Sequence, residues 1–199
     1  MGGAGQFIWD LSFSASTLSL LDPEVTRLLL THVVANADFA TNPIGVPQSW
    51  DGFLPYPNTV GSGQYCFDFI ASFLFIQCYV TLTGDLAVLE TPIQNNHDPS
   101  QSYTPLDFLR RVARNFEEYP ASVQSPFLVD YGSDKRNFLE AAPTYTNVIA
   151  GLQTANAGML FSLAGLLSSL PNNSALTDEI RGLRENATLI VQVTHRLLH

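Results

Sequence analysis

The most marked shortage in this sequence is charge. Only 14% of its 199 residues are Asp, Glu, Lys or Arg, whereas about a quarter is usual for a globular domain. Much of the surface must therefore be neutral and polar, or covered by something else. Lysine and arginine number 9 against 18 acidic residues, which gives a formal net charge of −9. Nucleic acid and anionic membrane surfaces both need clustered cations on the protein, so we expect neither nucleic acid nor a membrane as a partner.

Long hydrophobic runs are also missing. The most apolar stretch, YCFDFIASFLFIQCYVTLTG (65–84), is interrupted by Asp68, Ser72 and Gln77, and this pattern predicts a buried helix and not a membrane span. No basic segment followed by an apolar run opens the sequence, which favours a cytoplasmic location. The length and the 46% of hydrophobic residues predict one domain with a core over residues 1–199.

Patterns of metal-binding or disulfide-forming residues are scarce. The two cysteines, Cys66 and Cys78, would lie about 18 Å apart along one helix, which is too far for a disulfide. The four histidines are scattered and show no metal-ligand spacing. We therefore expect no metal site.

Helical periodicity, by contrast, is abundant. Apolar residues recur three and four positions apart over 145–170 and over 174–197, which predicts a helical hairpin with Ser174 as the N-cap of its second helix. No stretch alternates as a strand does, so the predicted fold class is all-α. Capping residues, prolines and the closing Gly84 predict further helices over 11–21, 22–39, 64–83, 85–90 and 104–119.

Four stretches carry side chains suited to a polar ligand. Trp followed by Asp occurs twice, as Trp9-Asp10 in GQFIWD and Trp50-Asp51 in PQSWDGF. An indole packs on the apolar face of a pyranose, and a carboxylate accepts hydrogen bonds from hydroxyl groups. This pairing predicts carbohydrate binding. The other candidates, from these two stretches and from LVDYGSDKRNFLE and TYTNVIAGLQTAN, are Phe7, Gln48, Asp130, Asp134, Glu140, Tyr145, Asn147 and Gln153.

Each candidate also has a structural interpretation. Asp10 taken alone fits better as the cap of a helix over 11–21, and Trp50-Asp51 fits a turn beside a packing anchor equally well. The acidic residues of the third stretch are explained equally well by a solvated loop that pairs with Lys135 and Arg136. Part of the role of Asn147, Gln153 and Asn156 is expected to be structural.

On this helical frame, the sequence resembles the six-hairpin glycosidases, and most of all their trehalase and glucosidase branch. The resemblance rests on GQFIWDLSF, VPQSWDGF, YCFDFIASFLFIQCYVTLTGDLAVLE and NFLEAAPTYTNVIAGLQTANAGMLFSLAGLLSSL. It implies αα-hairpins that form part of an (α/α)₆ toroid. The sequence predicts about six or seven of the twelve helices of a complete ring, so we expect a half-toroid, either a fragment of a longer protein or a reduced homologue.

The same resemblance implies inverting hydrolysis of an oligosaccharide or glucoside, which uses two carboxyl groups roughly 6.5–9.5 Å apart and no cofactor. It implies that Trp9 and Asp10 contact the sugar and that the general acid comes from the loop of Asp130 and Asp134. We favour Asp130, with Glu140 as another acid or a sugar ligand. The sequence shows no catalytic base. The alternatives are a non-catalytic carbohydrate-binding module, a helical interaction module and a sugar epimerase, although an epimerase would want paired histidines in the pocket.

Overall fold

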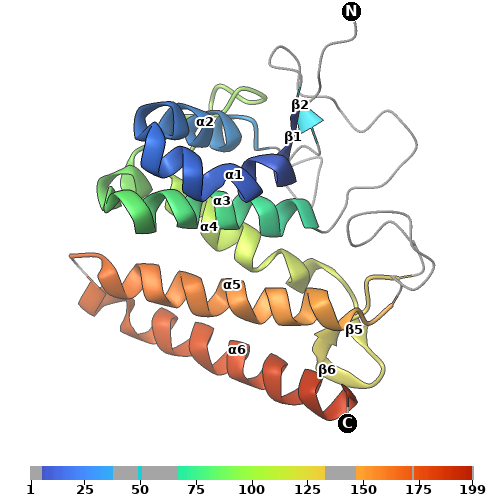
Figure 1. Ribbon diagram of the computed structural model, residues 1–199. Helices are drawn as coiled ribbons and strands as arrows, with labels where there is room; N and C mark the ends of the chain where they lie inside the picture. The colour runs from blue at the N-terminus through green and yellow to red at the C-terminus, as the bar shows by residue number, and fades with distance from the viewer. Residues whose placement is uncertain (1–5, 38–48, 51–66, 133–146, 172, 199) are drawn as a thin grey trace, which may run out of the picture. The chain divides into compact units, whose positions relative to one another are not determined.

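The computed structural model describes residues 6–37, 49–50, 67–132, 147–171 and 173–198. Helices dominate this part of the chain (Figure 1), which confirms the all-α class. The chain divides into two compact units, Met1–Val112 and Ala113–His199, and we describe each by itself. A single domain and a partial toroid stay predictions.

The first unit contains the helices α1 (Ile8–Leu21), α2 (Pro23–Ala35), α3 (Phe67–Thr83) and α4 (Pro105–Ala113). The last residue of α4, Ala113, belongs to the second unit. Helix α1 packs against both α2 and α3. The core between the helices is aliphatic and aromatic, and its fully buried side chains include Leu11, Ala15, Leu30, Phe69, Phe73 and Phe75. This burial supplies the main driving force for the unit.

Two predicted helix starts are confirmed in the first unit. The Asp22 carboxylate accepts a hydrogen bond from Val25 N at 3.1 Å, with Pro23 at the first helical position. The Thr104 hydroxyl accepts from Asp107 N at 3.0 Å, and the Asp107 carboxylate in turn accepts from Thr104 N at 3.2 Å. These reciprocal bonds form a capping box, which satisfies backbone N–H groups that the helix itself leaves free.

The predicted cap at Asp10 is wrong, because α1 begins at Ile8 and places Asp10 in its first turn. The reason is a short antiparallel pair, β1 (Gln6–Phe7) with β2 (Ser49–Trp50). Strand pairing ends at Phe7, so the chain enters the helix directly after it. A carboxylate in a first helical turn still faces the positive end of the helix dipole.

Helix α3 ends at the position predicted. Gly84 has a φ of +72°, and its N–H donates to Val80 O at 2.9 Å, which is the left-handed helix end that glycine favours. The predicted helix over 85–90 is a 3₁₀ helix, η1 (Leu86–Glu90). The next loop pairs β3 (Ile93–Gln94) with β4 (Ser102–Tyr103). A strand of two residues is too short to show the alternation of apolar and polar residues by which strands are predicted from a sequence.

The second unit begins with η2 (Asn115–Glu118) and a β-hairpin of β5 (Ala121–Ser122) and β6 (Ser125–Val129). The helix predicted over 104–119 is therefore wrong beyond Ala113. The hairpin was not predicted at all.

Helices α5 (Ala150–Ser169) and α6 (Thr177–Leu198) then form the predicted helical hairpin and lie side by side along their length (Figure 1). Between them lies the 3₁₀ helix η3 (Asn173–Leu176), so the predicted N-cap at Ser174 is wrong. Ser174 instead uses its carbonyl oxygen to accept a hydrogen bond from the Thr177 hydroxyl at 2.9 Å. The core that α5 and α6 share is apolar and includes Leu152, Leu160, Leu163, Leu167, Leu183 and Ala187.

Candidate functional site

The predicted sugar-binding residues fall into three groups. Five lie outside the described residues, namely Gln48, Asp51, Asp134, Glu140 and Tyr145. Four others are placed by their backbone alone, namely Phe7, Trp9, Asp10 and Trp50. Gln6 pairs with Trp50 and Phe7 with Ser49, so the β1–β2 pair brings together the two stretches that contain Trp-Asp. Asp130, Asn147 and Gln153 make up the third group and are described with their side chains.

Asp130 directly follows strand β6 and begins a tight turn, which we call the Asp130 turn (Asp130–Gly132). Its N–H donates to Pro120 O at 2.9 Å, and its Oδ1 accepts from Gly132 N at 2.8 Å. Gly132 has a φ of +77°, a conformation that residues with a Cβ rarely adopt. The half-buried Asp130 carboxylate has one oxygen engaged by the turn, and Oδ2 makes no hydrogen bond to the residues that the structure describes.

Asn147 closes a loop beside this turn. Tyr131 N donates to Asn147 O at 3.0 Å, and Asn147 N donates to Gly132 O. Asn147 has a φ of +58° and precedes α5, so the helix predicted from Tyr145 is wrong at its start. Gly132 and Asn147, which flank segment 133–146, are therefore held next to each other. The segment itself lies outside the described residues and contains three of the predicted sugar-binding residues, Asp134, Glu140 and Tyr145.

Gln153 lies behind the turn, on α5. Its amide Nε2 donates to Val129 O at 2.8 Å, and its Oε1 accepts from Val129 N at 3.3 Å. The side chain is 1% exposed, and both kinds of hydrogen-bonding group on its amide are engaged by the end of β6. The structural interpretation therefore accounts for Gln153.

Asn156, one turn further along α5, holds the other side of the Asp130 turn. Its Nδ2 donates to the Tyr131 hydroxyl at 2.6 Å, and the Tyr131 ring lies 5.0 Å from the Tyr119 ring at a tilt of 58°. Tyr119 was not among the predicted residues. No local signal marks it, because the β5–β6 hairpin brings it to Tyr131 across eleven intervening residues.

A hollow in the second unit was also missed. It measures about 290 Å³, which is at the small end for a ligand site, and we call it the Phe127 hollow. Most of its lining is apolar, and the residues are Phe116, Glu117, Tyr119, Ala121, Pro126, Phe127, Leu128, Val129, Asn186 and Ile190. Its residues come from η2, the hairpin and α6, so no single stretch of sequence contains it.

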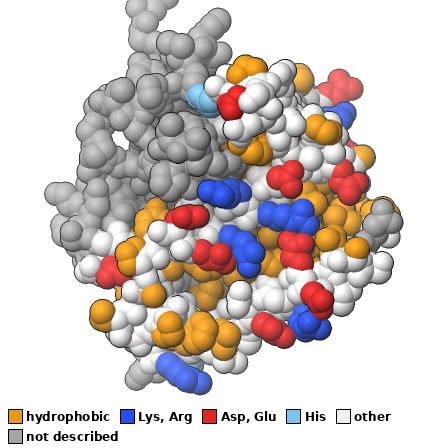
Figure 2. Space-filling view, turned by 180° about the vertical axis from the view of Figure 1, so that it is seen from behind, with side chains coloured by type: hydrophobic (Ala, Val, Ile, Leu, Met, Phe, Trp, Pro, Cys, Tyr) orange, Lys and Arg blue, Asp and Glu red, His pale blue; other side chains and the backbone are white. Residues whose placement is uncertain are grey.

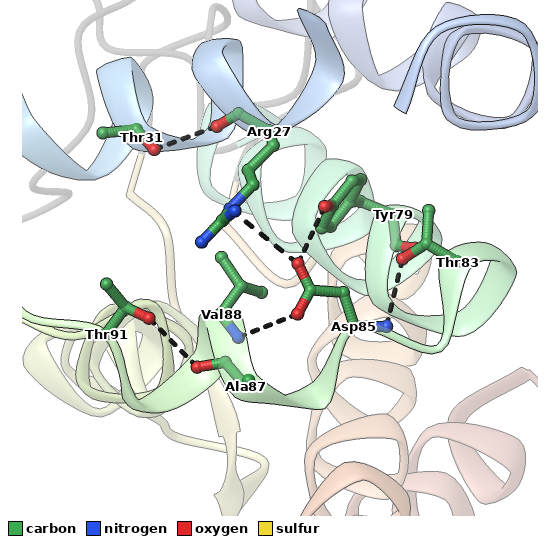
Figure 3. A network of polar contacts seen from close by, with 8 residues as sticks. All are labelled: Arg27, Thr31, Tyr79, Thr83, Asp85, Ala87, Val88 and Thr91. Carbon is green, nitrogen blue, oxygen red and sulfur yellow. Dashed lines mark hydrogen bonds and ion pairs between the residues drawn. The ribbon is translucent and has the colours of Figure 1, made fainter. Parts of the chain in front are cut away.

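In the first unit, Asp85 joins two neighbouring helices (Figure 3). Its Oδ2 accepts from the Tyr79 hydroxyl at 2.9 Å and lies 3.8 Å from Arg27 Nε, while Oδ1 accepts from Val88 N at 3.2 Å. Burial, followed by the hydrogen bond that the Tyr79 hydroxyl donates to Asp85, raises the pKa of Tyr79. Both carboxylate oxygens of Asp85 have partners, so this cluster stabilises the turn Thr83–Asp85 between α3 and η1.

Acidic and basic side chains are interspersed on the face shown in Figure 2, with hydrophobic side chains between them. Within the second unit, Arg114 pairs with Glu117 at 3.2 Å and Arg181 with Asp178 at 2.7 Å. The described residues contain no group of three or more side chains that could hold a metal ion. None of the described helices combines the length and the apolar character needed to cross a membrane.

Comparison with protein-family models finds no match, and a search of curated proteins finds none either.

Proposed function

We propose that this chain binds an oligosaccharide or glucoside at the Asp130 turn, as part of a glycoside hydrolase of the six-hairpin type in which Asp130 is the general acid. The observation that supports this proposal most is the pair of hydrogen bonds between the Asp130 turn and Asn147. Hydrogen bonds of Tyr131 and Gly132 to Asn147 hold together, beside Asp130, the two residues that flank segment 133–146. The sequence of that segment contains carboxyl, amide and phenol groups, and such groups bind sugar hydroxyls.

The hydrogen bonding of Asp130 determines which of its two oxygens is left to carry a proton. A protonated carboxyl group carries its proton on one oxygen, and the other oxygen remains an acceptor. Gly132 N–H occupies Oδ1, which directs the proton to Oδ2. From Oδ2 it could be donated to the oxygen of the leaving group, while a second carboxylate activates water on the opposite face of the sugar. No residue is assigned to that second role.

Two other functions have a specific observation in their favour. A non-catalytic carbohydrate-binding module needs no catalytic base, and no residue has been assigned that role. A helical interaction module would use the Phe127 hollow, whose lining residue Phe127 is 46% exposed, and Val123 between β5 and β6, which is 96% exposed.

We expect Asp130→Asn to separate these functions. Asparagine keeps an acceptor for Gly132 N–H but has no proton to donate, so hydrolysis should fall by roughly 10²–10⁴-fold while sugar affinity changes little. The measurements are calorimetric binding of gluco-oligosaccharides and release of the aglycone from aryl glucosides. Asp178→Asn is the matched control, because that carboxylate is 89% exposed on α6 of the same unit.

The outcomes differ clearly. Loss of hydrolysis with retained binding supports Asp130 as the acid. Binding without hydrolysis by the unaltered protein supports the non-catalytic module. No binding of any sugar contradicts the proposal and favours the interaction module.

A further inference from the structure

We infer that Gln153 and Asn156 are positioning residues that fix the direction of the Asp130 carboxylate, an inference that rests on the proposed function of Asp130. The two amides lie three positions apart on α5, so they share one face of that helix. One holds the residue before Asp130 and the other holds the residue after it.

The first attachment acts on Val129, the last residue of β6. On one side Val129 pairs with Ala121 of β5. On the other side its N–H and C=O groups are both satisfied by the Gln153 amide, as a third strand would satisfy them. Because Gln153 is 1% exposed, water cannot easily replace these bonds. The end of β6 is thereby tied to α5 immediately before Asp130.

The second attachment acts on Tyr131. Asn156 is fully buried and donates to the Tyr131 hydroxyl, while the Tyr131 ring lies against Tyr119. The Asn156 Oδ1 atom is buried and has no hydrogen bond to the described residues, so the bond to Tyr131 is what orients this amide. Asp130 therefore lies between two neighbours that are each held by α5.

A positioning role predicts more than a contribution to stability. If the two amides set the turn, their loss should alter the hydrogen bond from Gly132 N–H to Asp130 Oδ1. If they only stabilise the unit, that bond should stay as it is in the folded protein. The Gly132 amide resonance distinguishes these cases, because its chemical shift changes when its acceptor carboxylate gains a proton.

The experiment follows Gly132 by NMR in the ¹⁵N-labelled full chain while the pH is lowered from neutral. In Gln153→Leu we expect the titration shift of Gly132 to fall to less than half of its normal size. Its hydrogen exchange should become roughly tenfold faster, because the turn opens more often. Gln192→Leu is the matched control, since Gln192 is an exposed amide on α6, and both quantities should stay unchanged there.

A second variant keeps the test decisive if Gln153→Leu does not fold. Tyr131→Phe removes the acceptor of Asn156 and keeps the ring beside Tyr119, so it should change Gly132 in the same direction. An unchanged Gly132 shift and exchange rate in a folded variant, for either substitution, overturns the inference.

Sugar binding measured on the same variants separates this inference from the proposed function. If Gly132 responds to Gln153→Leu but the unaltered protein binds no sugar, the positioning stands and the proposed function fails. If the unaltered protein binds sugar and Gln153→Leu changes neither affinity nor Gly132, the proposed function stands and the positioning fails.

Discussion

Asp85 connects two helices of the first unit through its two carboxylate oxygens. One oxygen accepts a hydrogen bond from Val88 N and so caps the N-terminus of η1. The other accepts a hydrogen bond from the hydroxyl of Tyr79, which is 3% exposed. A buried phenol that donates to a carboxylate is favoured in its neutral form, so its pKa rises. A raised pKa in the folded state means that folding stabilises the protonated phenol.

We expect Tyr79→Phe to lower the free energy of unfolding by about 1 kcal/mol at neutral pH, because one buried hydrogen bond is lost. The stabilisation from Tyr79 is fully present below the ordinary phenol pKa of about 10 and is lost as pH rises through the higher folded value. The difference between the unaltered protein and the variant should therefore shrink above about pH 10. Urea unfolding at several pH values measures it.

Tyr103→Phe is the control for this prediction. It removes a phenol of the same unit whose hydrogen bond to Gln101 is exposed. Two results would contradict the role given to Tyr79. One is an equal change with pH in the free energy of unfolding for Tyr103→Phe. The other is a difference in the free energy of unfolding between the unaltered protein and Tyr79→Phe that grows at high pH.

At the scale of single elements, the α5–α6 hairpin is the clearest product of the sequence pattern. Leu163 on α5 is fully buried and Ala187 on α6 is fully buried, and both belong to the predicted apolar stripes. Packing of two such stripes against each other stabilises helices that would be marginal alone. Phe161, two residues from Leu163, is 44% exposed.

Leu163→Ala should therefore lower the free energy of unfolding by about 2–5 kcal/mol, through lost apolar burial and the cavity left behind. Phe161→Ala, on the exposed side of the same helix, should cost less than about 1 kcal/mol. Denaturant unfolding followed by far-ultraviolet circular dichroism gives both values. Equal losses in the free energy of unfolding for the two variants would contradict the burial of the Leu163 side of α5.

The sequence predicted the helices because their signals are local. Asp22, Thr104 and Gly84 act within four residues of the backbone groups that they satisfy, so their patterns can be read directly. The starts of α1 and α5 were wrong because distant partners set them. Pairing of β1 with β2 precedes α1, and the bonds of Asn147 to Tyr131 and Gly132 precede α5.

The same distinction applies to the candidate site. Asp130 and Asn147 were named as candidates from their motifs, but their arrangement with Tyr131 and Gly132 was not predicted. Gln153 meets Val129 across 24 positions and Asn156 meets Tyr131 across 25, and no spacing in the sequence encodes such pairs. The Phe127 hollow was invisible for the same reason, since three separate elements line it.

At the scale of the whole molecule, the low charge of the sequence is matched by exposed apolar side chains in each unit. In the first unit Leu21 is 80% exposed and Leu28 is 70% exposed, and in the second unit Val123 is 96% exposed. Large apolar groups exposed together often mark surfaces that another chain or segment covers. The predicted half-toroid would have such surfaces at its edges, and it stays a prediction.

The central claim is that a sugar binds at the Asp130 turn, and an NMR titration of the ¹⁵N-labelled chain with gluco-oligosaccharides tests it most directly. We predict saturable chemical-shift changes of the Tyr131, Gly132 and Asn147 amides, because these residues are hydrogen-bonded to one another beside Asp130. Shifts confined to the Phe127 hollow, or no shifts at all, would contradict the claim.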